Sequence, residues 1–227
     1  VGSLLTAGVD TTAYVIGWLW INLARNPDAR ERLVQELDSV LAGADVKEAD
    51  LDSLPYLRAC VRESHRLTPP GPLSHVRRLK RDITLGGYTF PAGQMLAMNV
   101  HAFQMDPQYV DDPEEYWPER WLPDAVAERK GTEREVLDHR LLQTPFGAGA
   151  RMCLGYKLAD IEIATVTARI FQDWDVSLDP PDQEWDLKQL LFVKADPFPK
   201  FKVTPRRKKL REVSVSVPWF AKLSTAV

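Results

Sequence analysis

The most distinctive chemistry in the sequence lies in one short segment that carries a cysteine among glycines. Three glycines and one cysteine fall within ten residues, just ahead of a stretch with helical periodicity, in Phe146-Gly147-Ala148-Gly149-Ala150-Arg151-Met152-Cys153-Leu154-Gly155. A thiolate in such a loop gains from the positive end of the helix dipole and from free main-chain N–H groups. The glycines allow the positive φ angles and the close main-chain approach that the loop needs. We call this segment the cysteine loop.

The kind of site that the loop could form is limited by its surroundings in the sequence. No second Cys or His stands at metal-ligand spacing from Cys153, which argues against a tetrahedral zinc site. A single thiolate ligand suits haem iron better. The alternative is a glycine-rich turn around an ordinary buried cysteine, because free Cys is among the most buried residue types.

A second segment, Ala7-Gly8-Val9-Asp10-Thr11-Thr12, places a hydroxyl among small residues near the start of the chain. In a helix, the Thr11 hydroxyl can donate to the carbonyl of Ala7, four residues earlier, which weakens or bends the helix. Small Ala7 and Gly8 leave space beside that bend. The alternative is close packing of this segment against another helix.

A third pattern is a possible ion pair on one helix. Glu63 and Arg66 are three residues apart, so they share a helix face and can pair. On spacing alone, the pair is interpreted as a surface salt bridge that contributes little to stability. Arg77 lies in a basic cluster further along the chain, whose other members are Arg78, Lys80 and Arg81.

Periodicity and turn residues predict the elements that must position these groups. We expect a helix from Pro27, after an Asn26 N-cap, to just before Gly43, and a second one that starts near 53–55 and stops before Pro69. Leu57 and Val61 mark the apolar face of the second helix. The later sequence predicts a hairpin over 82–90 and a strand over 95–100. An ordered loop is expected over 106–124, followed by a charged exposed insertion over 125–143. A helix over 154–171 and short strands over 176–203 are expected after the cysteine loop. The core stripe expected for the helix over 154–171 is Leu158, Ile161, Thr165, Ala168 and Phe171.

Composition bounds the class of protein. The 227 residues are 44% hydrophobic and 27% charged with a net charge of −3, which indicates a globular chain and argues against nucleic-acid binding. The cysteines, Cys60 and Cys153, are expected to be reduced. The most apolar stretch, residues 13–24, is shorter than the roughly 20 residues that cross a bilayer core, so we expect a buried helix. It is apolar on every side, and we expect the other helices of this chain not to cover all its faces.

The cysteine loop resembles the haem-binding signature of the cytochrome P-450 superfamily of haem-thiolate monooxygenases, Phe-x-x-Gly-x-Arg-x-Cys-x-Gly. Its fixed places are filled here by Phe146, Gly149, Arg151, Cys153 and Gly155. The Glu63–Arg66 pair is similar to the family's Glu-x-x-Arg helix. Pro118-Glu119-Arg120-Trp121 is similar to its Pro-Glu-Arg-Phe segment, with Trp in place of Phe, and residues 7–12 resemble its oxygen-groove signature.

The resemblance implies roles for these residues around haem b. Cys153 would be the axial iron ligand, Phe146 would shield its sulfur, Gly149 would shape the loop and Arg151 would bind a haem propionate. Thr11 would stabilise bound oxygen, while Asp10 would help to relay protons to it.

Other residues would act at the edge of the site or in the core, by the same resemblance. Arg77 would bind a propionate, and His75 would contact the propionates or the substrate wall. Glu63, Arg66 and Arg120 would form a buried structural triad, which is not catalytic.

Finer features resemble the mitochondrial type of this family. Arg58 and Arg62 lie one turn apart, like the paired basic residues with which such members bind an acidic ferredoxin, and Arg replaces the usual Lys at both places. The alternatives are a flavoprotein reductase as the donor and two solvated arginines on an exposed helix. The implied location is membrane-associated, in mitochondria or the endoplasmic reticulum, and a signal at the N-terminus would precede Val1.

The resemblance predicts a mainly α fold with small β-sheets (α+β), namely the haem-side, C-terminal portion of a cytochrome P450 domain over residues 1–205. A basic tail over 206–227 lies outside the resemblance. The implied activity inserts one oxygen atom from O₂ into a lipophilic substrate with electrons from a redox partner, and we expect the isolated chain to be inactive. The alternatives are a truncated, non-catalytic remnant that does not hold haem, and a family member that isomerises or dehydrates a peroxide. The intact Asp10-Thr11 pair favours oxygen activation over the peroxide reaction.

Overall fold

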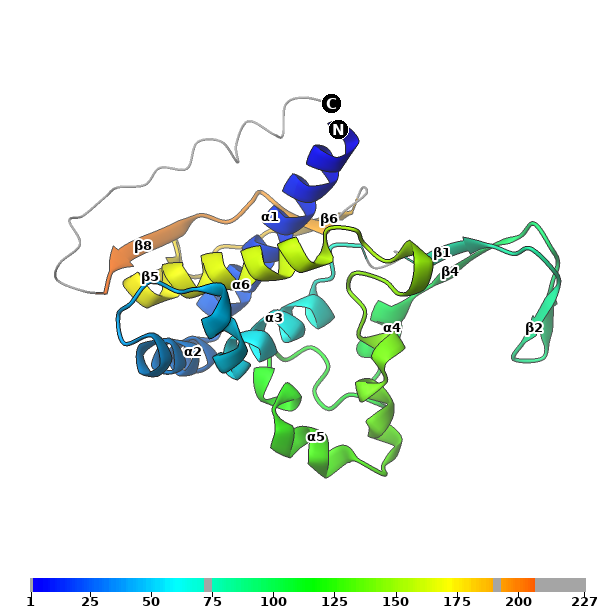
Figure 1. Cartoon of the computed structure of the whole chain (residues 1–227), viewed down its shortest axis with the longest axis horizontal. Helices are drawn as coiled ribbons and strands as arrows, with labels where there is room; N and C mark the ends of the chain where they lie inside the picture. The colour runs from blue at the N-terminus through cyan, green and yellow to red at the C-terminus, as the bar shows by residue number, and fades with distance from the viewer. Residues whose placement is uncertain (1, 72–74, 190–192, 207–227) are drawn as a thin grey trace.

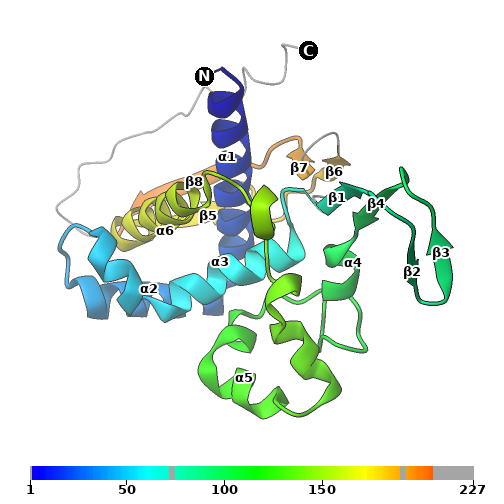
Figure 2. The same ribbon diagram turned by 45° about the vertical axis from the view of Figure 1, so that its right-hand side comes forward.

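The computed structural model describes residues 2–71, 75–189 and 193–206. Four longer helices form its centre: α1 (Gly2–Arg25), α2 (Pro27–Leu41), α3 (Pro55–Leu67) and α6 (Tyr156–Asp173). Figure 1 shows α1 rising out of this group, and Figure 2 shows the segment around α5 below it, with a β arm to one side. The mainly α fold with small sheets that the sequence predicts is confirmed.

The starts and ends of the helices follow the local sequence. Helix α2 starts at Pro27, as expected, and ends where Ala42 and Gly43 take positive φ angles of 48° and 86°. The Asn26 side chain does not cap α2. It donates back to the carbonyl of Asn22 at 2.7 Å. Helix α3 starts at Pro55 and buries the predicted face.

The main core lies where these four helices meet, and it also includes strand β5 (Trp174–Leu178). Its fully buried residues come from every one of these elements and include Leu19, Leu23, Leu33, Leu37, Leu57, Ile163, Phe171 and Val176. A second apolar cluster joins Trp18 and Ile21 of α1 to Ala195 of strand β7 (Val193–Asp196). Helix α1 is therefore covered on several sides.

The other helices alone do not cover every face of the apolar stretch of α1, as expected, but strands of this chain bury the face that they leave open. Val15, Trp18, Leu19, Ile21 and Leu23 are all buried. Strands β5 and β7 supply the cover that the other helices leave open.

The predicted core stripe of α6 is also partly wrong. Ala168 and Phe171 are buried, but Leu158 is 70% exposed, and Ile163 and Thr167 take the core positions earlier in the helix. The buried face turns toward α1, where the Trp20 indole donates to the Thr167 hydroxyl at 3.3 Å. The start of α6 thus carries an exposed apolar side chain where the predicted stripe expected a buried one.

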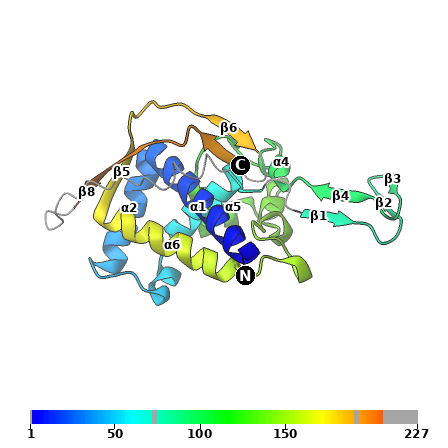
Figure 3. The ribbon, with the colours of Figure 1, turned by 90° about the horizontal axis from the view of Figure 1, so that it is seen from above.

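All sheets in the described part of the chain are two-stranded and antiparallel. Strands β1 (His75–Arg78) and β4 (Met95–Met98) form a ribbon, which continues into the hairpin of β2 (Ile83–Leu85) and β3 (Tyr88–Phe90). Figure 3 shows this arm reaching away from the helices. Gly86 and Gly87 make the predicted turn with φ angles of 56° and 83°. The remaining strands are β5 (Trp174–Leu178) with β8 (Phe201–Pro205), and β6 (Asp186–Gln189) with β7 (Val193–Asp196).

The segment between the arm and the cysteine loop is more ordered than the sequence indicates. It contains α4 (Val100–Gln104), α5 (Pro123–Arg129) and the 3₁₀ helices η2 (Pro118–Trp121), η3 (Glu133–Asp138) and η4 (Arg140–Leu142). The expectation of an exposed insertion over 125–143 is wrong in part. Leu137 is buried with Trp121, and Arg129 forms a two-pronged ion pair with Asp138 at 2.6 Å. Two further 3₁₀ helices, η1 (Glu48–Ser53) and η5 (Gly149–Arg151), complete the described elements.

A buried carboxylate joins this segment to α3. Glu63 is fully buried and receives five hydrogen bonds. Arg66 donates from Nε and Nη2 (3.0 and 2.8 Å), Arg120 from Nε (2.9 Å), Trp117 from its main-chain N–H (3.0 Å) and Trp121 from its indole (2.8 Å). Each lone pair of the carboxylate thus has a donor, which a buried charge requires.

The two arginines use their other N–H groups to hold the loop before η2. Arg66 donates to the carbonyls of Gln104, Pro113 and Glu115, at 3.1, 2.6 and 3.0 Å. Arg120 donates to those of Asp111 and Asp112, at 2.9 and 3.3 Å. Burial lowers the pKa of Arg120, but the neighbouring Glu63 opposes this shift. The triad therefore fixes the main chain of a loop that has little regular structure of its own.

The end of the described chain is anchored to α2 and α6. Arg206, the first residue of the basic run, donates to the carbonyls of Phe171 and Gln172 at 2.8 Å and pairs with Asp38 at 2.7 Å. Arg206 is therefore not a solvated residue, whereas the rest of the predicted tail, 207–227, lies outside the described residues. Across the helices that the structure describes, none combines the length and the hydropathy of a membrane span.

Trp121→Phe tests the buried carboxylate cage. This change keeps a ring but removes the indole N–H, so it should lower the free energy of unfolding by about 1.5–3 kcal/mol, the range for a hydrogen bond to a charged group. Denaturant unfolding followed by circular dichroism measures the difference. Trp117→Phe is the matched control, because Trp117 is 43% exposed and reaches Glu63 through its main chain. Equal losses in both variants would contradict the role given to the indole.

Candidate functional site

The cysteine loop is a series of tight turns that ends at the start of α6. Gly147 and Gly149 have φ angles of 77° and 72°, which favour glycine. The N–H of Gly147 bonds the carbonyl of Thr144, and that of Met152 bonds Gly149. The loop closes where the Cys153 N–H donates to the Phe146 carbonyl at 2.8 Å. The local sequence therefore fixes the main chain at Cys153.

The two thiols of the chain differ sharply in their surroundings. Cys153 is exposed, whereas Cys60 is fully buried in the main core. Burial raises the pKa of the Cys60 thiol well above its ordinary value. The alternative of a buried structural cysteine is thus wrong for Cys153 and fits Cys60.

The surface around Cys153 is apolar and exposed. Met152, Leu154 and Leu158 are 40%, 87% and 70% exposed. Arg151 is exposed beside them. Single exposed apolar side chains are ordinary, but a cluster of them marks a binding surface. An accessible sulfur with an apolar surround and one adjacent cation suits a flat apolar ligand that carries negative groups.

The first turns of α1 carry the second predicted group of site residues. Thr11 donates from Oγ1 to the carbonyl of Ala7 at 2.7 Å, which is the bond that the sequence predicts. Asp10 and Thr11 are half-buried, while Gly8 and Val9 are exposed. A Cβ built on Gly8 would meet nothing within 4 Å, so this face of α1 is open. The close-packing alternative therefore does not describe Gly8.

Helices α1 and α6 meet at the Trp20–Thr167 hydrogen bond and separate toward their N-terminal ends, as Figure 1 shows. The N-terminal part of α1 carries Asp10 and Thr11, and the N-terminal end of α6 follows Cys153. The exposure of Val9 and Leu158 agrees with this separation. No hydrogen bond or ion pair among the described residues joins Thr11 to the cysteine loop.

Strand β1 holds the two other predicted cofactor contacts. Arg77 is exposed, and its guanidinium donates to the carbonyl of Val76 in the same strand at 2.8 Å. His75 pairs with Met98 in the β1–β4 ladder, and its side chain lies outside the described part. Within the described ranges, no hydrogen bond or ion pair joins Arg77 to the cysteine loop.

The arginines predicted to meet an electron donor are not equivalent. Arg58 is exposed and pairs with Asp52. Arg62 lies flat over the Trp121 ring, 4.0 Å from its centroid, and 3.9 Å from Asp138. Burial lowers the pKa of Arg62 to about 10. Arg58 is thus an exposed cation paired with Asp52, and Arg62 packs on the Trp121 ring.

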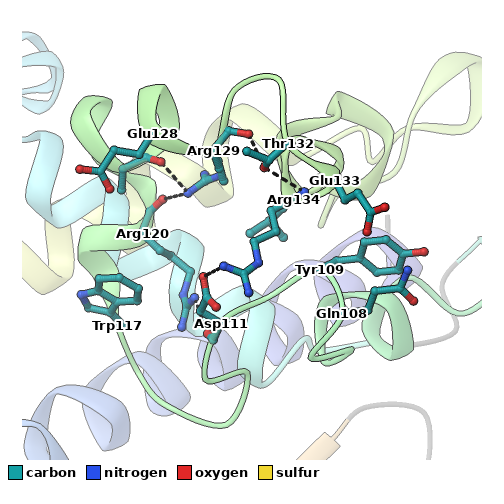
Figure 4. Close-up of a pocket in the computed structure, with 12 residues that line it drawn as sticks. Gln108, Tyr109, Asp111, Trp117, Arg120, Glu128, Arg129, Thr132, Glu133 and Arg134 are labelled. Atoms are coloured by element: carbon teal, nitrogen blue, oxygen red, sulfur yellow. Dashed lines mark hydrogen bonds and ion pairs between the residues drawn. The ribbon is translucent and has the colours of Figure 1, made fainter.

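A pocket of about 460 Å³ lies away from the cysteine loop, under η2, α5 and η3. Figure 4 shows its charged lining: Arg134 pairs with Asp111 at 2.6 Å, and Arg129 donates to the carbonyl of Arg120 at 2.6 Å. Its arginines are therefore satisfied within the chain. Of the predicted site residues, the pocket contains Arg120, which belongs to the structural triad.

The sequence interpretation missed His65, which lies between Ser64 and Arg66 on α3. Its ring meets the Phe146 ring edge-to-face, with centroids 6.0 Å apart and planes at 70°. The available signal was a polar residue within a buried helical motif. Spacing along the chain could not show this contact, because 81 positions separate the two rings.

Comparison with known proteins identifies the family of the chain. The sequence model for Cytochrome P450 matches residues 1–203. The chain is 37% identical over 177 residues to the mitochondrial 1,25-dihydroxyvitamin D(3) 24-hydroxylase of Rattus norvegicus, covering 78% of this chain and 32% of that protein. It is 39% identical over 173 residues to Cytochrome P450 705A5 of Arabidopsis thaliana, covering 76% and 33%. It is 38% identical over 211 residues to a flavonoid-6-hydroxylase of Ocimum basilicum, covering 90% and 38%.

The chain thus spans about a third of the length of these relatives. The family match runs through the open face of α1, the buried triad, the cysteine loop and α6. The chain belongs to the cytochrome P450 family.

Proposed function

We propose that residues 1–205 form the haem-side, C-terminal part of a haem-thiolate monooxygenase, which inserts one oxygen atom from O₂ into a lipophilic substrate. Cys153 carries this proposal, because its thiol is exposed at the end of a loop that its own N–H fixes. Membership of the family supports the class of reaction. The hydroxylase and monooxygenase names of several relatives support it further.

The residues around Cys153 fit haem b. The thiolate supplies one anionic ligand, the exposed Met152, Leu154 and Leu158 supply an apolar surface, and Arg151 supplies a cation for a propionate. The bound haem would supply the redox chemistry that activates O₂. Arg77 is our candidate for a second propionate contact, with His75 beside it in the same strand.

Phe146 and Gly149 prepare the thiolate for this role. The half-buried Phe146 ring keeps water from one side of the loop, and its carbonyl orients the main chain of Cys153. Gly149 allows the positive φ angle that turns the chain before η5. Free main-chain N–H groups at the start of α6 favour the anionic sulfur.

Thr11 and Asp10 are suited to proton delivery from the α1 side. The Thr11 hydroxyl donates its hydrogen bond to the Ala7 carbonyl, so the lone pairs of Oγ1 remain to accept a hydrogen bond. A hydroxyl that accepts one proton while it releases another can pass protons onward. Asp10, the preceding residue, can supply them from the half-buried side of the helix.

The electron donor in this proposal is an acidic ferredoxin that docks on α3. The exposed Arg58 supports the contact, and the Trp121 ring holds Arg62 one turn further along. A mitochondrial or endoplasmic-reticulum membrane is the proposed location. The mitochondrial name of the rat relative supports the first of these.

Cys153→His tests the thiolate assignment in the full-length protein. The ferrous carbon-monoxide complex should show the strongly red-shifted Soret band of a thiolate ligand, and the variant should lose it because imidazole is a neutral ligand. Cys60→Ser is the control thiol change and should keep the band. Persistence of the band in Cys153→His would contradict the assignment. A wild-type protein that takes up no haem would favour the non-catalytic remnant.

Thr11→Ala tests proton delivery. Haem incorporation should stay intact, while electrons from the donor go to peroxide or water instead of product, because the relay atom Oγ1 is gone. The yield of product per electron should fall by roughly 10²-fold or more, the usual contribution of a positioned proton donor. Thr11→Ser, which keeps the hydroxyl, is the control. Unchanged coupling in Thr11→Ala would refute the role.

Arg58→Glu tests the docking face. Reduction of the haem protein by an acidic ferredoxin should slow by about tenfold or more at low salt, because electrostatic steering of association is lost. The difference should shrink as salt rises. Arg81→Glu makes the same charge change on the β arm and should have little effect. Equal slowing by both variants would point to net charge instead of a docking face.

A further inference from the structure

His65 connects α3 to the cysteine loop. Its ring packs edge-to-face on Phe146, at 6.0 Å between centroids and 70° between planes. The Phe146 ring also lies near that of Tyr156, the first residue of α6, with centroids 6.4 Å apart and planes at 55°. Phe146 therefore contacts one ring from α3 and another from α6.

The Phe146 main chain in turn holds the cysteine. Its carbonyl accepts the Cys153 N–H at 2.8 Å, and this bond closes the cysteine loop. A rotation of the Phe146 side chain that shifted its main chain would disturb this bond. The position of the His65 ring therefore bears on the position of Cys153.

The rotation of α3 that presents His65 is fixed by the residues on either side. Glu63 and Arg66 are fully buried in the carboxylate cage, and Ser64 accepts a hydrogen bond from Asn22 at 3.1 Å. Because these neighbours are locked, the direction in which residue 65 leaves the helix is set. The packing of the core therefore places His65 against the cysteine loop.

Simple packing does not account for a histidine at this position. Its Nδ1 atom is buried and has no hydrogen-bond partner among the described residues. Burial lowers the pKa of His65 to about 4, so the ring is neutral near pH 7. An aliphatic side chain would fill space without an unpaired polar atom. The contact that an aliphatic residue could not make is the aromatic one with Phe146.

We propose that His65 is a positioning residue for the Cys153 thiolate: its ring holds Phe146 against the cysteine loop and so keeps the Phe146 carbonyl aligned with the Cys153 N–H. This inference rests on the proposed function, in which Cys153 is the haem ligand. It assigns to His65 a role in keeping the thiolate state, with no direct contact with substrate.

The test is the stability of the thiolate band in the full-length haem protein. In the ferrous carbon-monoxide complex, loss of the red-shifted Soret band under gentle warming reports loss of the thiolate ligand. His65→Leu and His65→Gln remove the ring, and both should lose the band roughly two- to tenfold faster than wild type, the factor that an aromatic pair supplies. His65→Phe restores a ring and should decay at the wild-type rate.

A matched control separates this effect from general destabilisation. Val61→Ala removes buried volume from the same helix, so it should lower the melting temperature measured by circular dichroism while the band decays as in wild type. Wild-type decay in either ring-less variant, or fast decay in His65→Phe, would overturn the inference. A wild-type protein that never shows the band would instead overturn the proposed function, so the two failures are distinguishable.

Discussion

The buried carboxylate of Glu63 is the constraint on which the rest of this structure depends. A charge with no exposure to water must be met by donors on every side, and this requirement draws together residues from α3 and from η2, more than 50 positions later. Arg66 and Arg120 then extend the same network into the carbonyls of residues 104–115. The loop before η2 has little regular structure of its own, and the hydrogen bonds of Glu63 and its two arginines fix its main chain.

The buried Glu63 network also positions the residues around the cysteine loop. The same helix turn that buries Glu63 presents His65 to Phe146, and Phe146 holds the N–H of Cys153. On the opposite side of the cage, Trp121 carries the guanidinium of Arg62, which lies nearer the surface. One turn of α3 therefore carries both the residue that contacts the cysteine loop and a residue of the face proposed for the electron donor. The chemistry of the site and the architecture of the core are not separate in this part of the fold.

Local signals in the sequence were sufficient for most elements and for the cysteine loop, because prolines, glycines and apolar spacing act within a few residues. Pro55 started α3 and Gly86-Gly87 made the hairpin, as their chemistry requires. Contacts between residues far apart in the sequence determined the remaining features of the fold. The cover of α1 came from strands β5 and β7, and the buried face of α6 shifted to Ile163 and Thr167. His65 escaped notice because its partner is distant in sequence, and the packing of Arg62 on Trp121 could not be predicted for the same reason.

The β arm has a consequence for handling this chain in solution. The β1–β4 ribbon and the β2–β3 hairpin are two-stranded, so within the described residues their outer edges carry unsatisfied main-chain donors and acceptors. Leu85, Tyr88, Met95 and Met98 are more than half exposed along the same arm. Such edges template the addition of further strands. Self-association of the chain by strand exchange should therefore grow with protein concentration, and the arm, not the helical centre, is where oligomers would begin.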